Sequence, residues 1–131
     1  MENTVLPLVT VMIPCYNHEK YIKESIQSVI DQTYSRLELI VIDDGSKDNS
    51  VQKIEEMRLA CEQRFEFFKF IFRENRGLSK TLNQGLSFAH GDYFSTVASD
   101  DIMLSEKTAI QVDVFKKDPL ITAVFGAHQY I

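Results

Sequence analysis

The chain has 131 residues, of which 44% are hydrophobic, and these values suit a single globular domain over residues 1–131. Its formal net charge is −5, and its lysines and arginines are scattered rather than gathered into a basic run. A nucleic-acid surface needs a concentrated positive field, so we expect no nucleic-acid partner. No apolar run approaches the roughly 18 residues of a membrane-spanning helix, so we expect no transmembrane segment.

The cysteine content and the N-terminal residues bear on the compartment. Cys15 and Cys61 are the two cysteines, and their spacing suits neither a zinc site nor a disulfide framework. The first apolar stretch is not preceded by the basic residues of a secretion signal. These features predict reduced thiols and a cytoplasmic location. Peripheral association with the inner face of the membrane is the alternative that remains open.

Apolar runs and helical periodicities alternate along the chain. In chain order they predict a strand over 8–13, a helix over 18–32, a strand over 37–42, a helix over 47–64, a strand over 65–72, a helix over 78–89, a strand over 92–98, a helix over 104–117 and a fifth strand over 120–127. This alternation is typical of βαβ crossovers. The predicted fold class is therefore α/β, with a mostly parallel sheet flanked by helices.

The helices carry more detailed predictions. Asn17 precedes the first helix and is a candidate N-cap. Two helices show an apolar stripe that should face the sheet. In the second helix the stripe is Val51, Ile54, Met57 and Cys61, and in the third it is Leu78, Leu82, Leu86 and Ala89.

The loops that follow the first four strands should share one edge of the sheet, where ligands of open α/β sheets collect. They contain Tyr16, Asn17, Asp43, Asp44, Arg76, Lys80, Asp100 and Asp101. An acidic pair at a helix start is often only a cap, which is the alternative role for each Asp pair. Two acidic pairs at one edge would repel each other unless a divalent cation or strong hydrogen-bond donors relieve them.

A divalent metal, Mg²⁺ or Mn²⁺, would use one or two of these carboxylates and complete its shell with water and substrate phosphates. The chain has neither a P-loop nor a G-x-G-x-x-G fingerprint, so the metal would have to hold the phosphates. Tyr16 could offer its ring to a nucleobase, although a loop tyrosine more often serves ordinary packing. Asp43 or Asp44 could accept a hydrogen bond from a base imide or a ribose hydroxyl.

Three stretches, in this order, resemble the family 2 glycosyltransferases. They are "VTVMIPCYNHEKYIKESIQSVIDQTYSRLELIVIDDGSKDNS", "ENRGLSKTLNQGLSFAHGDYF" and "SDD", and together they cover nearly the whole chain. Members of this family are inverting enzymes with a Rossmann-like GT-A fold that binds nucleotide-diphosphate sugars. The resemblance therefore implies a glycosyltransferase that moves a sugar from such a donor, with a UDP-sugar favoured, to a glycan, lipid-linked or protein acceptor.

The same resemblance implies roles for individual residues. Pro14, Tyr16 and Asn17 would form the base pocket, and Asp44, with or without Asp43, would contact the base or the ribose. Asn75, Arg76 and Gly77 match the loop that closes over the nucleotide. "SDD" resembles the family's Asp-x-Asp metal motif, so that Asp100 or Asp101 would bind the metal and the other would contact ribose or support the site. Many members have an acid where this chain has Ala98.

The resemblance also implies that catalytic and acceptor-binding elements follow this stretch. The family's catalytic base and acceptor-binding elements come well after the metal motif, so the base is expected beyond Ile131. We therefore expect the 131 residues to be the donor-binding half of a longer protein, and to be inactive or weakly active alone. A non-catalytic nucleotide-sugar-binding module is the main alternative, and a receiver-like phosphoacceptor domain is a more remote one. His18, His90 and His128 are expected to have surface or capping roles rather than to bind metal.

Overall fold

The computed structural model of the chain describes residues 6–118. The fifth strand expected over 120–127 lies outside these residues. The elements are β1 (Val9–Cys15), α1 (Ile22–Ile30), β2 (Leu37–Asp44), α2 (Ser50–Glu56), α3 (Arg58–Arg64), β3 (Phe67–Arg73), α4 (Leu78–Phe88), β4 (Tyr93–Thr96) and α5 (Lys107–Lys117). Each expected strand within the described residues is present, and so is each expected helix, except that the one over 47–64 is divided into α2 and α3; the ends differ by a few residues.

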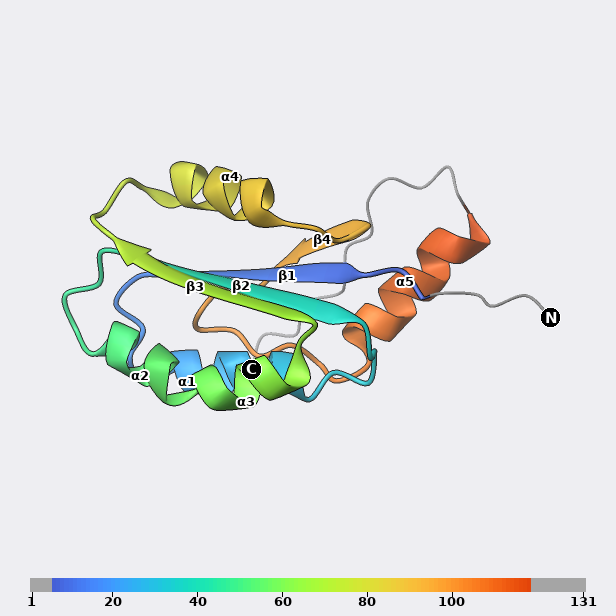
Figure 1. Cartoon of the computed structure of the whole chain (residues 1–131), viewed down its shortest axis with the longest axis horizontal. Coiled ribbons are helices and arrows are strands. Elements are labelled where there is room, and N and C mark those ends of the chain that lie inside the picture. Colours follow the sequence, from blue (N-terminus) through green and yellow to red (C-terminus); the bar gives the residue numbers. More distant parts are fainter. Residues whose placement is uncertain (1–5, 119–131) are drawn as a thin grey trace.

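The four strands form one parallel sheet in the order β3-β2-β1-β4 (Figure 1). This confirms the predicted α/β class and the parallel pairing. β1 and β2 lie at the centre, and almost all of their residues are buried because helices cover both faces. The carboxyl ends of all four strands point to the same edge, on the left in Figure 1.

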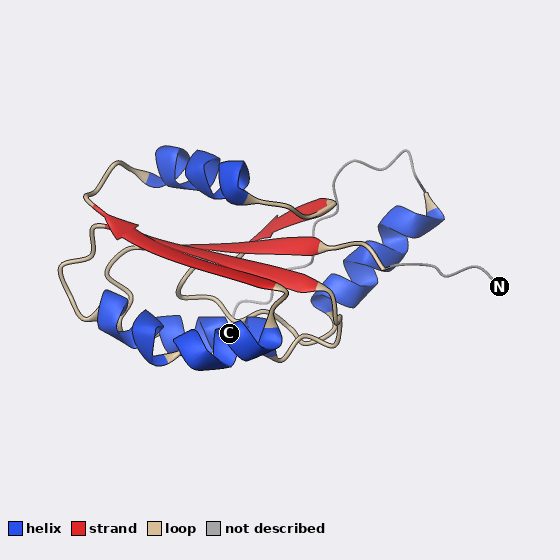
Figure 2. Ribbon diagram, viewed as in Figure 1, coloured by secondary structure: helices blue, strands red, loops and turns tan. Residues whose placement is uncertain are grey.

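The helices lie in two layers, as Figure 2 shows: α4 covers one face, and α1, α2 and α3 cover the other. Alternate residues of the central strands feed two apolar clusters. The larger cluster lies under α1 to α3 and includes Val11, Ile13 and Leu39, together with Val112 of α5. The smaller cluster, under α4, is built on Met12, Ile40 and Ile42.

The predicted cap of the first helix was wrong. α1 begins at Ile22 with Tyr21 at its N-cap, and no side chain caps it. The backbone carbonyl of His18 instead accepts the N–H groups of Tyr21 and Ile22, at 3.0 and 2.9 Å. Asn17 has a left-handed φ of 53°, and its side chain accepts a hydrogen bond from the N–H of Lys47. Asn17 therefore joins two loops rather than starting a helix.

The expected helix over 47–64 is two helices, because the chain tightens between them. The N–H of Met57 donates to the carbonyl of Ile54, three residues back, at 2.9 Å, and this 3₁₀-type bond separates α2 from α3. The inward stripe survives the break, since Ile54, Met57 and Cys61 are buried. Val51 is only partly buried.

The predicted inward face of the third helix was partly wrong. Leu78 and Leu86 of α4 are exposed, and the residues of this helix that are fully buried are Thr81 and Gly85. A Cβ added to Gly85 would lie 2.6 Å from Cγ of Met12, so the helix lies close against the sheet at this glycine. Thr81 and Gly85 therefore face the sheet, Leu82 and Ala89 of the predicted stripe pack against the smaller cluster, and Leu78 and Leu86 are turned away from the sheet.

Candidate functional site

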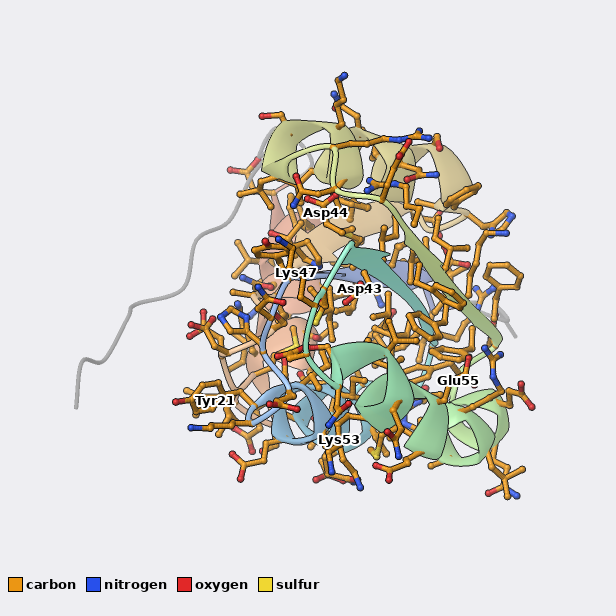
Figure 3. All side chains as sticks on the ribbon, turned by 90° about the vertical axis from the view of Figure 1, so that its left-hand side faces the viewer. Tyr21, Asp43, Asp44, Lys47, Lys53 and Glu55 are labelled. Atoms are coloured by element: carbon orange, nitrogen blue, oxygen red, sulfur yellow. The ribbon has the colours of Figure 1, made fainter. Side chains whose placement is uncertain are left out.

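The loops expected to form the site do meet at the carboxyl edge of the sheet. Figure 3 faces this edge, with Asp43, Asp44 and Lys47 close to the end of β2. The loop after β2 touches the loop after β1 on one side and the loop after β3 on the other. Hydrogen bonds make both connections, and they are described in turn below.

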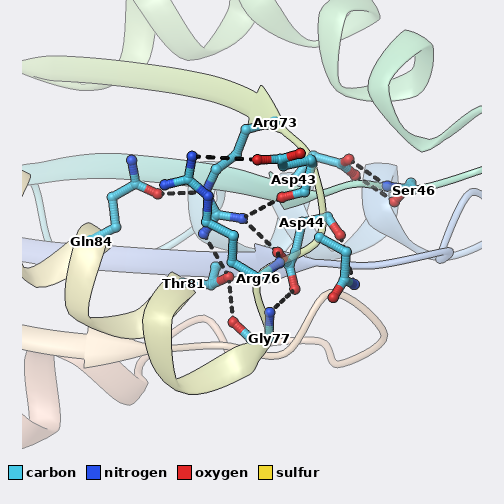
Figure 4. A network of polar contacts seen from close by, with 10 residues as sticks. Asp43, Asp44, Ser46, Arg73, Arg76, Gly77, Thr81 and Gln84 are labelled. Atoms are coloured by element: carbon cyan, nitrogen blue, oxygen red, sulfur yellow. Dashed lines mark hydrogen bonds and ion pairs between the residues drawn. The ribbon is translucent and has the colours of Figure 1, made fainter.

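Asp44 anchors the loop between β3 and α4 (Figure 4). Its Oδ1 accepts hydrogen bonds from Nη1 of Arg73 at 2.5 Å and from the N–H of Arg76 at 2.7 Å, and its Oδ2 accepts one from the N–H of Gly77 at 3.1 Å. Burial by itself would raise the pKa of Asp44, but these donors outweigh it and lower the pKa below the usual value. Asp44 is therefore a carboxylate at neutral pH.

Further contacts hold the same loop in place. Arg73 also donates to Oε1 of Gln84 at 2.7 Å and to Oγ1 of Thr81 at 2.9 Å, so the guanidinium links β2 to α4. Gly77 has a φ of 93°, a conformation that glycine adopts without strain. Asn75 donates from Nδ2 to the backbone carbonyl of Asp44 at 3.0 Å. Of the predicted site residues, Asp44, Asn75, Arg76 and Gly77 are thus brought together.

Arg76 is held through its backbone, while its side chain remains available. The guanidinium is half exposed and lies 3.8 Å from the carboxylate of Glu74. Lys80, the other cation expected in these loops, lies on α4 and is exposed. The guanidinium of Arg76 can therefore offer several N–H donors to an anionic ligand at the sheet edge.

Asp43 faces the opposite side of the sheet from Asp44, because successive side chains of a strand alternate. Its two carboxylate oxygens accept the N–H of Ser46 at 2.8 Å and the hydroxyl of Ser46 at 2.5 Å. The carboxylate is buried, and it shapes the turn after β2. The two adjacent acids are therefore relieved by hydrogen-bond donors, one of the two means expected for them.

The loop after β1 is joined to the loop after β2. The N–H of Asn17 donates to Oγ of Ser46, and the N–H of Lys47 donates to Oδ1 of Asn17, both at 2.8 Å. Tyr16 is exposed beside them, and Pro14 is partly buried. A hollow of about 270 Å³ lies where the two loops meet, and it is lined by Asn17, His18, Glu19, Lys20, Tyr21 and Asp48.

The "SDD" stretch lies after β4, where Ser99 is buried and Asp100 and Asp101 are exposed. Asp100 faces His18, with 3.9 Å between its Oδ2 and Nε2 of the imidazole. Within residues 6–118, no group of three or more His, Cys, Asp or Glu side chains is arranged to hold a metal. Any metal here would need ligands beyond these side chains, such as water and substrate phosphates.

Two residues of the site were not predicted from the sequence. Arg73 was counted among the scattered basic residues, although it ends a strand and is in register with Asp44 of the neighbouring strand. A charged residue at the end of an apolar strand was the available signal. Ser46, which satisfies Asp43, follows directly from the "DDGS" turn but was not singled out.

Comparison with known proteins gives the class. The model of the family "Glycosyl transferase family 2" matches residues 10–130. The chain belongs to this family, and its fold is that of the GT-A transferases. The family assignment leaves no support for the receiver-domain alternative.

Individual relatives agree with the assignment. An uncharacterised glycosyltransferase of Rickettsia conorii is 38% identical over 125 residues, which are 95% of this chain and 20% of that protein. The crystal structure of Staphylococcus aureus TarS 1-349 in complex with UDP has a TM-score of 0.73 at 29% identity, covering 84% of this chain and 32% of that one. The mannosyltransferase PcManGT of Pyrobaculum calidifontis, in complex with GDP-Man and Mn²⁺, has a TM-score of 0.78 at 25% identity, covering 90% and 34%.

The chain therefore spans between a fifth and about a third of these relatives. Within residues 6–118, no helix has both the length and the apolar character needed to cross a membrane.

Proposed function

We propose that the chain is the donor-binding half of a glycosyltransferase that transfers a sugar, with inversion, from a nucleotide-diphosphate sugar. The observation that carries the proposal is the Asp44 network, which ties the loop of Asn75, Arg76 and Gly77 to the carboxyl edge of a sheet of the GT-A type. The bound UDP of TarS and GDP-Man of PcManGT support a nucleotide-sugar ligand. A UDP-sugar is the favoured donor.

The base pocket is assigned to Pro14, Tyr16 and Asn17. Tyr16 is exposed and can offer its ring to a base, while the bonds of Asn17 to the next loop keep the pocket wall in place. A carboxylate has about four acceptor sites, so Asp43 and Asp44 retain acceptor capacity for the base or the ribose beyond their internal bonds.

The diphosphate is assigned to the space between Arg76 and the "SDD" stretch. Asp100 and Asp101 are the exposed carboxylates that suit a divalent metal, Mg²⁺ or Mn²⁺, together with substrate oxygens. Such an ion supplies neutralisation of the charge that develops on the leaving diphosphate. Arg76 contributes a second positive charge from the protein itself. Whichever of Asp100 and Asp101 does not bind the metal contacts the ribose or supports the carboxylate that binds the metal.

The acceptor and its general base are assigned to residues after Ile131. Asp43 and Asp44 bond to the loops, and Asp100 and Asp101 are assigned to the donor and its metal, so none of these four carboxylates is left to deprotonate an acceptor hydroxyl. We expect the 131 residues alone to bind a nucleotide diphosphate weakly and to transfer little or no sugar. The acceptor is a glycan, a lipid-linked molecule or a protein.

Calorimetric titration with UDP and GDP, with and without Mn²⁺, tests the proposal. Wild type should bind one nucleotide diphosphate more tightly when Mn²⁺ is present, and Asp100→Asn or Asp101→Asn should remove that gain. Asp113→Asn is the matched control, because it makes the same change on α5, where Asp113 pairs with Lys117 at 2.8 Å. If Mn²⁺ did not change the nucleotide affinity of wild type or of any variant, the metal assignment would be contradicted.

A sugar-transfer assay distinguishes the glycosyltransferase from the alternative, a non-catalytic binding module. A protein extended to the length of the relatives should transfer sugar from the nucleotide sugar that the shorter chain binds. Binding without transfer, tried with glycan, lipid-linked and protein acceptors, would favour the module. Efficient turnover by the 131 residues alone would refute the division into donor and acceptor halves.

A further inference from the structure

The side chain of His18 bridges two loops of the site. Its Nδ1 lies 2.5 Å from Oγ of Ser99, in the loop after β4, although the two residues are 81 positions apart in the sequence. Its Nε2 points toward Asp100, 3.9 Å from Oδ2. The ring also meets Tyr21 edge to face, with centroids 6.1 Å apart. The imidazole is therefore placed between a buried hydroxyl and an exposed carboxylate.

The backbone of His18 is held as firmly as its ring. Its N–H donates to Oγ of Ser50 at 3.0 Å, and that hydroxyl in turn donates to Oδ1 of Asp48 at 2.6 Å. Its carbonyl accepts the N–H groups that start α1. Three segments thus fix this one residue: its own loop, the start of α2 and the loop after β4. A surface histidine with only a solvent role would not need this support.

We propose that His18 is a positioning residue that orients the carboxylate of Asp100 toward the diphosphate and its metal. This inference rests on the proposed function. When Ser99 donates its hydroxyl hydrogen to Nδ1, the neutral imidazole carries its own hydrogen on Nε2, the atom that faces Asp100. A small rotation of the exposed carboxylate then brings Oδ2 within hydrogen-bond range of that N–H. Partners of this kind set the orientation of metal-binding side chains.

Two substitutions of His18 distinguish the role of Nδ1 from the role of Nε2. Asparagine places its amide near the position of Nδ1, so His18→Asn can keep the contact with Ser99 but cannot reach Asp100. Glutamine reaches the position of Nε2, so His18→Gln can restore the contact with Asp100. A purely structural role through Ser99 would be rescued by asparagine, and the positioning role by glutamine.

The experiment measures Mn²⁺ affinity by electron paramagnetic resonance of the 131-residue chain with UDP present. We expect His18→Asn to weaken Mn²⁺ binding by about tenfold, the range found for supporting partners of metal ligands, and His18→Gln to stay close to wild type. In the Asp100→Asn background, adding His18→Asn should cost nothing more, because the two residues act as a unit. His90→Asn is the control, since His90 contacts the carboxylate of Glu38 away from the site, at 3.1 Å.

Four results would overturn the inference, and the last of them would also defeat the proposed function. Rescue by asparagine instead of glutamine would make the role structural. Nitrogen coupling to Mn²⁺ that is lost in His18→Asn would make His18 a metal ligand rather than a positioning residue. Wild-type affinity in every His18 variant, with a loss in Asp100→Asn, would remove His18 from the site while leaving the proposed function intact. A wild-type chain that binds neither UDP nor Mn²⁺ would instead defeat the proposed function, and this inference with it.

Discussion

Replacing Asp44 by asparagine should destabilise the fold strongly, because its carboxylate is buried and its cationic partner is largely buried. The side chains of Asp44 and Arg73 are 8% and 12% exposed, and Arg73 donates to Asp44 while the N–H groups of Arg76 and Gly77 do the same. Asparagine keeps one acceptor oxygen but loses the charge and turns an NH₂ group toward these donors. The guanidinium of Arg73 then loses its ionic partner.

The magnitude follows from burial. Breaking a buried ion pair on one side costs about 3–5 kcal/mol, and each hydrogen bond to a charged group contributes about 1.5–3 kcal/mol. We therefore expect Asp44→Asn to lower the free energy of unfolding by about 3–5 kcal/mol, a large part of the roughly 5–15 kcal/mol available to a domain. Urea denaturation followed by circular dichroism measures this loss.

A surface pair provides the matched control. Glu55 accepts from Arg58 at 2.8 Å with side chains 43% and 39% exposed, and such pairs contribute only about 0.2–1 kcal/mol. Glu55→Gln makes the same acid-to-amide change and should cost less than about 1 kcal/mol. Equal losses in Asp44→Asn and Glu55→Gln would refute the reasoning, because burial would then not decide the strength of the pair.

Three further predictions concern pH, packing and thiol reactivity. The pKa of Asp44 is lowered in the folded state, so its stabilisation is fully present above the unfolded-state value of 3.8 and is lost as the pH falls through the folded-state value; acid titration should therefore destabilise wild type more than Asp44→Asn, and parallel curves would contradict this. Gly85→Ala should cost about 1–3 kcal/mol in thermal unfolding, since the new Cβ would lie 2.6 Å from Cγ of Met12, and a neutral result would mean that the methionine moves aside. Burial, reinforced by the charge of Asp43, raises the pKa of the Cys15 thiol to about 11, and burial raises that of Cys61 to about 12. Both cysteines should thus react with a thiol reagent at pH 8 only as the chain unfolds, and rapid labelling of the native chain would show that they are accessible.

Much of the fold could be predicted from local patterns in the sequence. Strands such as "LELIVI" and helices such as the one around Ile26 and Val29 show their period directly, and their alternation allows few arrangements other than a parallel sheet covered on both faces. The site could be placed at the carboxyl edge because that follows from parallel strands and from the resemblance of the loops to a known family. These are properties of neighbouring residues and of their order along the chain.

Two of the errors, the cap of the first helix and the inward face of α4, share one physical cause, which is contact between segments distant in sequence. Asn17 precedes a helix and is of a capping type, yet it bonds to the loop after β2, and the next residue, His18, provides the start of α1 through its carbonyl. Leu78 and Leu86 have the period of an inward face, yet α4 turns Gly85 to the sheet because the helix must lie close to Met12. Periodicity shows that a helix has an apolar side, but the neighbour decides which side is buried.

The sequence by itself determined the class of the protein: a parallel α/β sheet, the family and the edge that carries the acidic loops. Only the tertiary structure decided what each acid does. Asp43 and Asp44 are adjacent in sequence but face opposite sides of the sheet, where one shapes a turn with Ser46 and the other pairs with Arg73. Asp100 meets His18 only because β1 and β4 pair side by side. Electrostatic interactions depend on the distance between charges and on their burial, and neither quantity can be read from the order of the residues.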